Sequence, residues 1–141
     1  MKRDIVKEKF ILCQKSVDAT IDDLSIVQDL LDTIDQNNTD IITCVGMAAN
    51  MIGKLKRIMV VKDDNNKNIV IINPKVLKYT GKSYQIEEGC LCHEGVRLTT
   101  RYEKLKIEYR DQNFNLRIKT FSGLTAQTIQ HEMDHFEGKL I

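Results

Sequence analysis

The chain contains 141 residues, of which 42% are hydrophobic and 29% are charged, and its formal net charge at pH 7 is +1. This length suits a single domain spanning residues 1–141 with one hydrophobic core. The balanced charge provides no basic surface, so no nucleic-acid partner is expected. The sequence holds no run near the roughly 20 apolar residues of a membrane span, and its charged N-terminus is unlike a signal peptide. We therefore expect a cytoplasmic protein that does not bind membranes.

Four cysteines occur in the chain, at positions 13, 44, 90 and 92. Without a secretory signal they are expected to be reduced thiols or metal ligands rather than disulfide partners. Cys90 and Cys92 are separated by one residue, and alternate residues of an extended strand point to opposite faces. Only one of these two side chains can therefore face a given site.

The first predicted element is a helix over residues 18–39. Thr20 and Asp22 offer N-caps, and the apolar residues that follow recur at helical spacing. Residues 41–53 then combine small side chains with two glycines. Such a run lets the backbone approach another group closely, so it forms either a tight buried turn or a wall for a substrate backbone.

Runs of β-branched and apolar residues then predict strands, at residues 57–61, 69–73, 76–80, 83–86, 104–109 and 115–121. Pro74 is expected to end the second of these strands, and the polar segment 111–113 predicts a hairpin turn. A final helix runs from Leu124 to about Phe136, with Gly138 as its C-terminal cap. The predicted fold class is α+β, with short and mostly antiparallel strands around this C-terminal helix and one helix near the N-terminus.

The C-terminal helix carries an HExxH pattern. His131 and His135 are four residues apart, so both lie on one face of the helix and can bind a single metal ion. Glu132 is turned by about 100° around the helix, where it can act as a general acid or base on water at the metal. Two ligands, one acid/base group and an open position together indicate a catalytic metal site.

A catalytic site of this kind needs a third protein ligand. Cys90 lies between two predicted strands and can supply a thiolate, which is among the best ligands available. A buried structural cysteine is the alternative interpretation of this position.

Three stretches of the sequence resemble the signature motifs of the peptide deformylases. They read Val-Gly-Met-Ala-Ala at 45–49, Glu-Gly-Cys-Leu at 88–91 and Gln-His-Glu-Met-Asp-His at 130–135. Members of that family remove the formyl group from N-formylmethionine at the start of new bacterial proteins. The resemblance covers nearly the whole chain and implies the same fold, the same activity and a formylated peptide as substrate.

The resemblance also implies roles for individual residues. Cys90, His131 and His135 would bind one divalent metal ion, typically Fe²⁺, with Zn²⁺, Ni²⁺ or Co²⁺ able to replace it. Glu132 would take a proton from the attacking water and deliver it to the leaving amine. The backbone N–H of Leu91 would stabilise the negative charge that develops on the formyl oxygen.

Substrate contacts are likewise implied by the resemblance. Val45 and Gly46 would form main-chain hydrogen bonds with the peptide, as an added strand does. Glu88 matches a family residue that pairs with a following arginine, here Arg101. The remaining residues expected to contact the substrate are Gly89, Arg97, Leu124, Gln127 and Thr128.

The chain departs from the family pattern at several of these positions. Met51 replaces a glutamine whose side chain donates a hydrogen bond to the oxyanion, and a thioether has no donor. Loss of one such donor typically costs about a hundredfold or more in rate, so a slow enzyme is expected. Gln127 and Thr128 are polar where the family often has apolar residues around the methionine side chain, which predicts altered side-chain specificity.

Two other functions remain open on the sequence alone. One is a non-enzymatic paralogue that binds metal or formylated peptides; Met51 supports it, and the retention of Glu132 opposes it. The other is an ordinary HExxH peptidase, which usually takes its third ligand downstream, where only Glu137 is present and is poorly spaced. We also expect a monomer, and no C-terminal ribosome-docking extension after residue 141.

Overall fold

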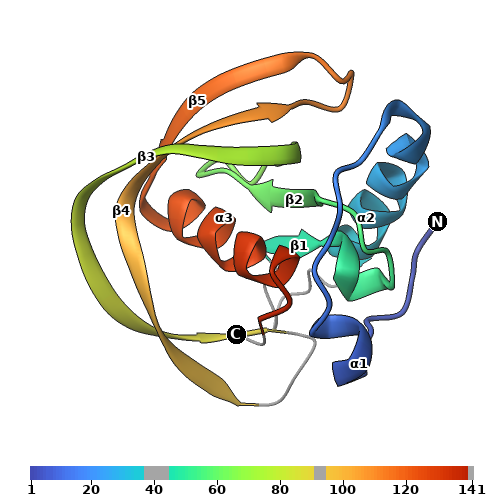
Figure 1. Cartoon of the computed structure of the whole chain (residues 1–141), viewed down its shortest axis with the longest axis horizontal. Helices are drawn as coiled ribbons and strands as arrows, with labels where there is room; N and C mark the ends of the chain where they lie inside the picture. The colour runs from blue at the N-terminus through green and yellow to red at the C-terminus, as the bar shows by residue number, and fades with distance from the viewer. Residues whose placement is uncertain (37–44, 91–94, 140–141) are drawn as a thin grey trace.

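A computed structural model describes residues 1–36, 45–90 and 95–139. Five strands form one antiparallel sheet in the order β1-β2-β3-β4-β5, as Figure 1 shows. The strands are β1 Gly46–Ala48, β2 Ile58–Lys62, β3 Asn68–Gly89, β4 Val96–Arg110 and β5 Leu116–Ser122. The helices are α1 Lys9–Leu12, α2 Leu24–Gln36 and α3 Gly123–Phe136, with 3₁₀ turns η1 Ile21–Asp23 and η2 Ala49–Ile52. This arrangement confirms the predicted α+β class.

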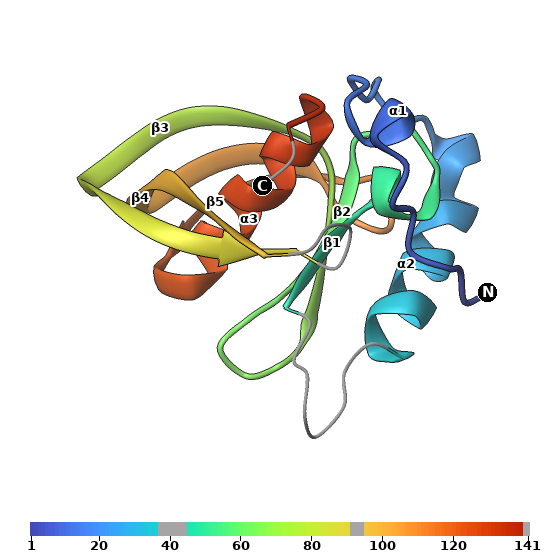
Figure 2. The same ribbon diagram turned by 90° about the horizontal axis from the view of Figure 1, so that it is seen from below.

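The central strands lie between helices α2 and α3 (Figures 1 and 2). They separate two hydrophobic cores, one under each of these helices. Along β2, Ile58 and Val60 belong to the core that contains α2, whereas Met59 and Val61 belong to the core that contains α3. This alternation follows from the two-residue period of a strand, and both faces are buried, so β2 is apolar throughout. The sheet therefore holds the two helices apart on opposite sides.

Helix α2 begins later than the sequence suggested, because the chain first forms the 3₁₀ turn η1. The side chain of Thr20 accepts a hydrogen bond from the backbone of Asp22, and the side chain of Asp23 accepts one from the backbone of Thr20. These reciprocal bonds form a capping box that fixes the start of the helix. Two predicted segments lie outside the described residues: the end of the predicted helix, 37–39, and the first part of the small-residue run, 41–44.

Two strands are much longer than the short strands predicted from the sequence. Pro74 does not end a strand; β3 continues through it and through Gly81, and pairs with β4 from Ile72 to Gly89. The ladder shifts register between Ile72 and Lys75 and again between Thr80 and Ser83. At such bulges a residue without an N–H is tolerated, and the strand bends. The β3–β4 ribbon consequently curves around α3, as both views show.

The C-terminal helix ends as predicted. Gly138 has φ +78, and its N–H donates to the carbonyl of His135 at 3.0 Å. The preceding turn is tied to the N-terminal segment, because the N–H of Ser16 donates to the carbonyl of Phe136 at 2.8 Å. Among the described residues, no helix has the length and hydrophobicity that crossing a membrane would require.

Gly138→Ala is expected to destabilise the protein for two reasons. A side chain at positive φ costs about 1 to 3 kcal/mol, and here a Cβ would also meet the backbone carbonyl of Cys13. Gly123→Ala is the matched control, since Gly123 also has positive φ (+61) but a Cβ there has no other atom within 4 Å. Urea denaturation should show a clearly larger decrease in the free energy of unfolding for Gly138→Ala than for Gly123→Ala. Equal decreases would contradict the steric explanation.

Candidate metal centre and substrate cavity

The structure brings Cys90, His131 and His135 together beside one cavity. Cys90 directly follows β3, while both histidines lie on one face of α3. The Cys90 Sγ lies 3.4 Å from His135 Nε2, which is 3.2 Å from His131 Nε2. All three ligand atoms lie within 4.8 Å of one another.

These distances fit a tetrahedral metal ion. With metal–nitrogen and metal–sulfur bonds of roughly 2.0 and 2.3 Å, a tetrahedral angle separates two nitrogens by about 3.3 Å and a nitrogen from sulfur by about 3.5 Å. The structure has separations of 3.2 and 3.4 Å. His131 and His135 are buried, with 8% and 0% exposed surface, so their Nε2 atoms face each other away from solvent. A bound cation would stabilise this arrangement of two nitrogen lone pairs.

Glu132 lies beside the three ligands and is itself buried, with 2% exposed surface. Its Oε1 is 4.0 Å from His135 Nε2 and has no hydrogen-bond partner among the described residues. Burial raises the pKa of Glu132 to about 7. A carboxyl group with such a pKa exchanges a proton readily near neutral pH.

A second carboxylate, Glu88, orients the first histidine. Its Oε1 accepts a hydrogen bond from His131 Nδ1 at 2.8 Å, and Arg101 binds both of its oxygens. Burial alone would raise the pKa of Glu88, but the hydrogen bonds from His131 and Arg101 outweigh it and hold the pKa at about 2. Because Nδ1 donates to Glu88, the neutral imidazole of His131 has its lone pair on Nε2, which faces the other ligands.

The electrostatics of the cluster favour positive charge at its centre. Burial lowers the pKa of His131, but hydrogen bonds to Cys90 and Glu88 outweigh it and raise that pKa to about 10. The groups that stabilise a proton there would also stabilise a metal cation in its place.

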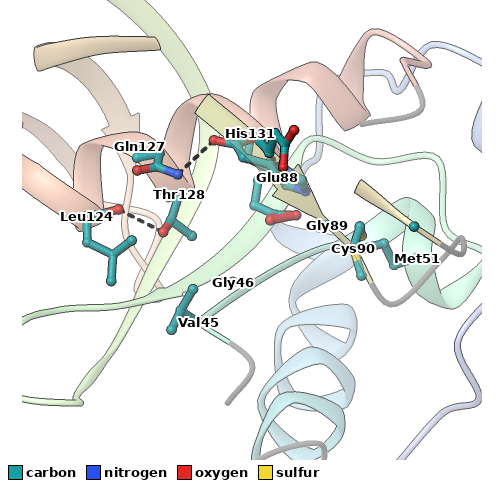
Figure 3. A pocket seen from close by; sticks show the side chains of 13 residues that line it. Val45, Gly46, Met51, Glu88, Gly89, Cys90, Leu124, Gln127, Thr128 and His131 are labelled. Atoms are coloured by element: carbon teal, nitrogen blue, oxygen red, sulfur yellow. Dashed lines mark hydrogen bonds and ion pairs between the residues drawn. The ribbon is translucent and has the colours of Figure 1, made fainter. Parts of the chain in front are cut away.

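A cavity of about 510 Å³ opens next to the cluster. Figure 3 shows Leu124, Gln127 and Thr128 along α3 on one side of it, with Val45 and Gly46 opposite. Gly46 comes so close to α3 that a Cβ at this position would clash with the Thr128 methyl group and lie 3.1 Å from Glu132 Oε2. Glycine is therefore required for this approach, which supports the interpretation of the segment as a wall.

The other expected substrate residues are placed as follows. Gly89, Cys90 and Met51 line the same cavity, and Met51 is buried with its sulfur 4.0 Å from Cys90 Sγ. Arg97 lies on β4 opposite Glu88 in the ladder, is exposed, and is not part of the cavity lining. Leu91 and Cys44 lie outside the described residues, so the predicted oxyanion donor stays a prediction.

Several residues of this site were not predicted from the sequence. Asp134 binds Arg101 Nη1 at 2.7 Å, so Arg101 connects Glu88 on β3 to α3. Asn50 Nδ2 donates to the carbonyl of His135 at 3.0 Å and ties the first motif to the helix. Asp134 lies within the third motif and Asn50 directly follows the first, but neither position has a sequence pattern that indicates its partner.

Comparison with known proteins agrees with this geometry. The family model described as "Polypeptide deformylase" matches residues 4–141. A peptide deformylase of Clostridium beijerinckii is 48% identical over 141 residues, which covers 100% of each chain. The chain belongs to the peptide deformylase family. The sequence-based resemblance is thereby confirmed.

Solved structures of peptide deformylases share the fold. The enzyme from Synechococcus elongatus in complex with actinonin has a TM-score of 0.85 at 30% identity, covering 98% of this chain and 75% of that chain. A peptide deformylase from Legionella pneumophila also has a TM-score of 0.85 at 30% identity, covering 99% of this chain and 83% of that chain. The curved β3–β4 ribbon and the helix inside it are thus the framework of a deformylase.

Arg101→Met should destabilise the protein strongly, because it removes the guanidinium that binds the buried carboxylate of Glu88 and also pairs with Asp134. Breaking a buried ion pair in this way typically costs about 3 to 5 kcal/mol. Arg117→Met is the matched control, since Arg117 pairs with Asp111 at the surface and such pairs contribute little. Urea denaturation gives the free energy of unfolding of both variants. Similar decreases would show that the ion pairs of Arg101 with Glu88 and Asp134 are not essential to stability.

Proposed function

We propose that the protein is a metal-dependent hydrolase that removes the formyl group from N-formylmethionyl peptides. This proposal rests on the convergence of Cys90, His131 and His135 beside a buried Glu132 oxygen that has no hydrogen-bond partner among the described residues. Membership of the peptide deformylase family supports it. We further propose that residues 1–141 act as one domain and as a monomer, because ligands, acid/base group and cavity all come from this one chain. The proposed location is the cytoplasm.

Cys90, His131 and His135 would hold one divalent ion, and we propose Fe²⁺, with Zn²⁺, Ni²⁺ and Co²⁺ as alternatives. When bound, the ion supplies Lewis acidity, polarising the formyl group and lowering the pKa of water. One thiolate and two imidazoles suit all four metals, so supply rather than ligand type selects among them.

The peptide would bind in an extended form along β1. This strand lies at the end of the sheet order, and Val45 and Gly46 line the cavity. Main-chain hydrogen bonds to these two residues would place the formyl end next to Glu132, which is close to Gly46. Arg97, exposed on β4, would contact the peptide only outside the cavity.

Glu132 would move the proton during the reaction. With a pKa of about 7, its carboxylate can accept a proton from water and then deliver it to the amine that leaves. Its burial excludes bulk water, which would otherwise compete for this proton.

The charge that develops on the formyl oxygen would be stabilised by fewer donors than is usual for such a site. We propose the backbone N–H of Leu91 as one donor. Met51, buried in the cavity wall, has no hydrogen-bond donor in its side chain. A slow enzyme is the expected consequence.

The side chain that follows the formyl group would lie against Leu124, Gln127 and Thr128, with Gly89 at the opposite wall. The Thr128 hydroxyl donates to the carbonyl of Leu124 at 2.8 Å, and the Gln127 amide donates to Glu88 at 2.9 Å (Figure 3). Both polar groups are thus engaged within the protein, which reduces the polarity that the sequence alone suggested. We propose an apolar side chain such as methionine, with a tolerance that differs from that of relatives carrying apolar residues here.

The two other functions receive less support. A binding-only paralogue would not need the buried carboxyl group of Glu132, which lies beside the metal ligands with its Oε1 4.0 Å from His135 Nε2. An HExxH peptidase would need a downstream third ligand, whereas the thiol of Cys90 lies within reach of both histidines.

Glu132→Gln should abolish formate release from a formyl-Met-Ala peptide while leaving metal binding intact. Loss of a general acid/base typically costs about 10² to 10⁴ in rate. The measurement is formate release by anaerobically purified, Fe²⁺-loaded protein, together with the metal content of both proteins. A wild-type protein that binds one metal per chain but releases no formate would exclude the proposed function.

Met51→Gln should increase the turnover number, because it adds a hydrogen-bond donor where the oxyanion would form. A gain of about tenfold or more is expected, since loss of one such donor costs about 10²–10³ elsewhere. Met51→Leu is the control, as it changes the side chain without adding a donor. Equal turnover in all three proteins would show that this position does not contact the reacting oxygen.

A further inference from the structure

Gln127 is hydrogen-bonded to the carboxylate that orients a metal ligand. Its Nε2 donates to Glu88 Oε2 at 2.9 Å, and Figure 3 shows this bond beside His131. The other oxygen, Oε1, receives His131 Nδ1 at 2.8 Å and Arg101 Nη2 at 2.7 Å. Gln127 thus binds the side of the carboxylate that His131 does not use.

The amide of Gln127 is itself held in place. Its Oε1 accepts a hydrogen bond from the Tyr84 hydroxyl at 3.4 Å, which comes from the middle of β3. Gln127 lies on α3 four residues before His131, so both side chains project from the same face of the helix. These hydrogen bonds form the chain Tyr84–Gln127–Glu88–His131. It alternates between β3 and α3 and ends at the metal ligand.

We infer that Gln127 is a positioning residue for the metal centre, acting through Glu88 on His131. This inference rests on the metal site of the proposed function. A carboxylate bound on both oxygens is fixed in rotation as well as in position, and the direction of its Oε1 sets the plane of the His131 ring. Without Gln127, Oε2 would keep the 3.0 Å bond from Arg101 Nε as its single hydrogen bond within the described part of the chain.

The location of Gln127 gives this role a second aspect. The residue lines the cavity in which the first side chain of the substrate is proposed to lie. The same side chain therefore contacts the substrate and holds Glu88. A bulky substrate side chain that displaced the Gln127 amide would loosen the support of His131.

Zinc release tests the inference without requiring turnover. Gln127→Met keeps the length of the side chain and removes the donor. Zinc-loaded protein is mixed with a chromogenic chelator, and the zinc dissociation constant is obtained by competition. Loss of an outer partner of a metal ligand typically weakens metal binding by about 10- to 100-fold, and we expect a change in that range.

Gln28→Met is the matched control. Gln28 also donates from Nε2 to a carboxylate, Asp32 Oδ1 at 2.8 Å, but on the exposed side of α2. The Gln28→Met substitution removes the same kind of hydrogen bond far from the metal ligands, so it should leave zinc affinity unchanged. Circular dichroism of each variant establishes that the comparison is made between folded proteins.

A double-mutant cycle with Glu88→Gln separates a positioning role from a general effect on packing. If Gln127 acts through Glu88, Gln127→Met should weaken zinc binding much less in the Glu88→Gln background. Equal weakening in both backgrounds, or unchanged zinc affinity in Gln127→Met, would overturn the inference.

Turnover ratios for formyl-Met and formyl-Leu peptides complete the design, because a residue that is only a cavity wall would change these ratios and leave zinc affinity unaltered. Zinc affinity is measured whether or not formate is released, so failure of the proposed function is seen separately.

Discussion

The buried ion pairs of Arg101 connect the parts of the molecule that must meet for the metal ligands to converge. The guanidinium lies on β4, with 3% of its surface exposed, and binds Glu88 at the end of β3 and Asp134 on α3. Arg101 and Glu88 are both buried, and either charge would be costly to bury alone, so their pairing favours this mutual position of the ribbon and the helix. Since Glu88 also receives the Nδ1 proton of His131, the contacts that hold the ribbon on the helix also orient a metal ligand.

The curvature of the sheet makes this arrangement possible. A straight β3–β4 ribbon would pass along one side of α3, whereas the register shifts near Pro74 and Gly81 bend it around the helix (Figures 1 and 2). Cys90 is thereby returned to the face of α3 that carries His131 and His135. Two residues that usually interrupt strands thus help to close the site.

The parts of this structure that depend on local geometry were predictable from the sequence. The helical spacing of His131 and His135 placed them on one face, and the cap at Gly138 followed from the preference for glycine at positive φ. The chemistry of a thiolate made Cys90 a candidate for the third ligand, but only its motif decided against a structural cysteine, because nothing in the spacing links residue 90 to residue 131. The bulges at Pro74 and the contacts of Asp134, Asn50 and Gln127 depend on partners far along the chain, and local patterns contain no information about these partners.

The position of β1 at the end of the sheet limits the state in which a substrate can be processed. A peptide that binds along a strand must itself be extended over several residues, so a protein whose first residues are already folded into a helix or a core cannot bind there. Recognition through main-chain groups is also nearly indifferent to sequence beyond the first side chain. Under the proposed function, the time available for the reaction therefore ends when the N-terminal segment of each new protein folds, and a slow catalyst would process slowly folding chains more completely than rapidly folding ones.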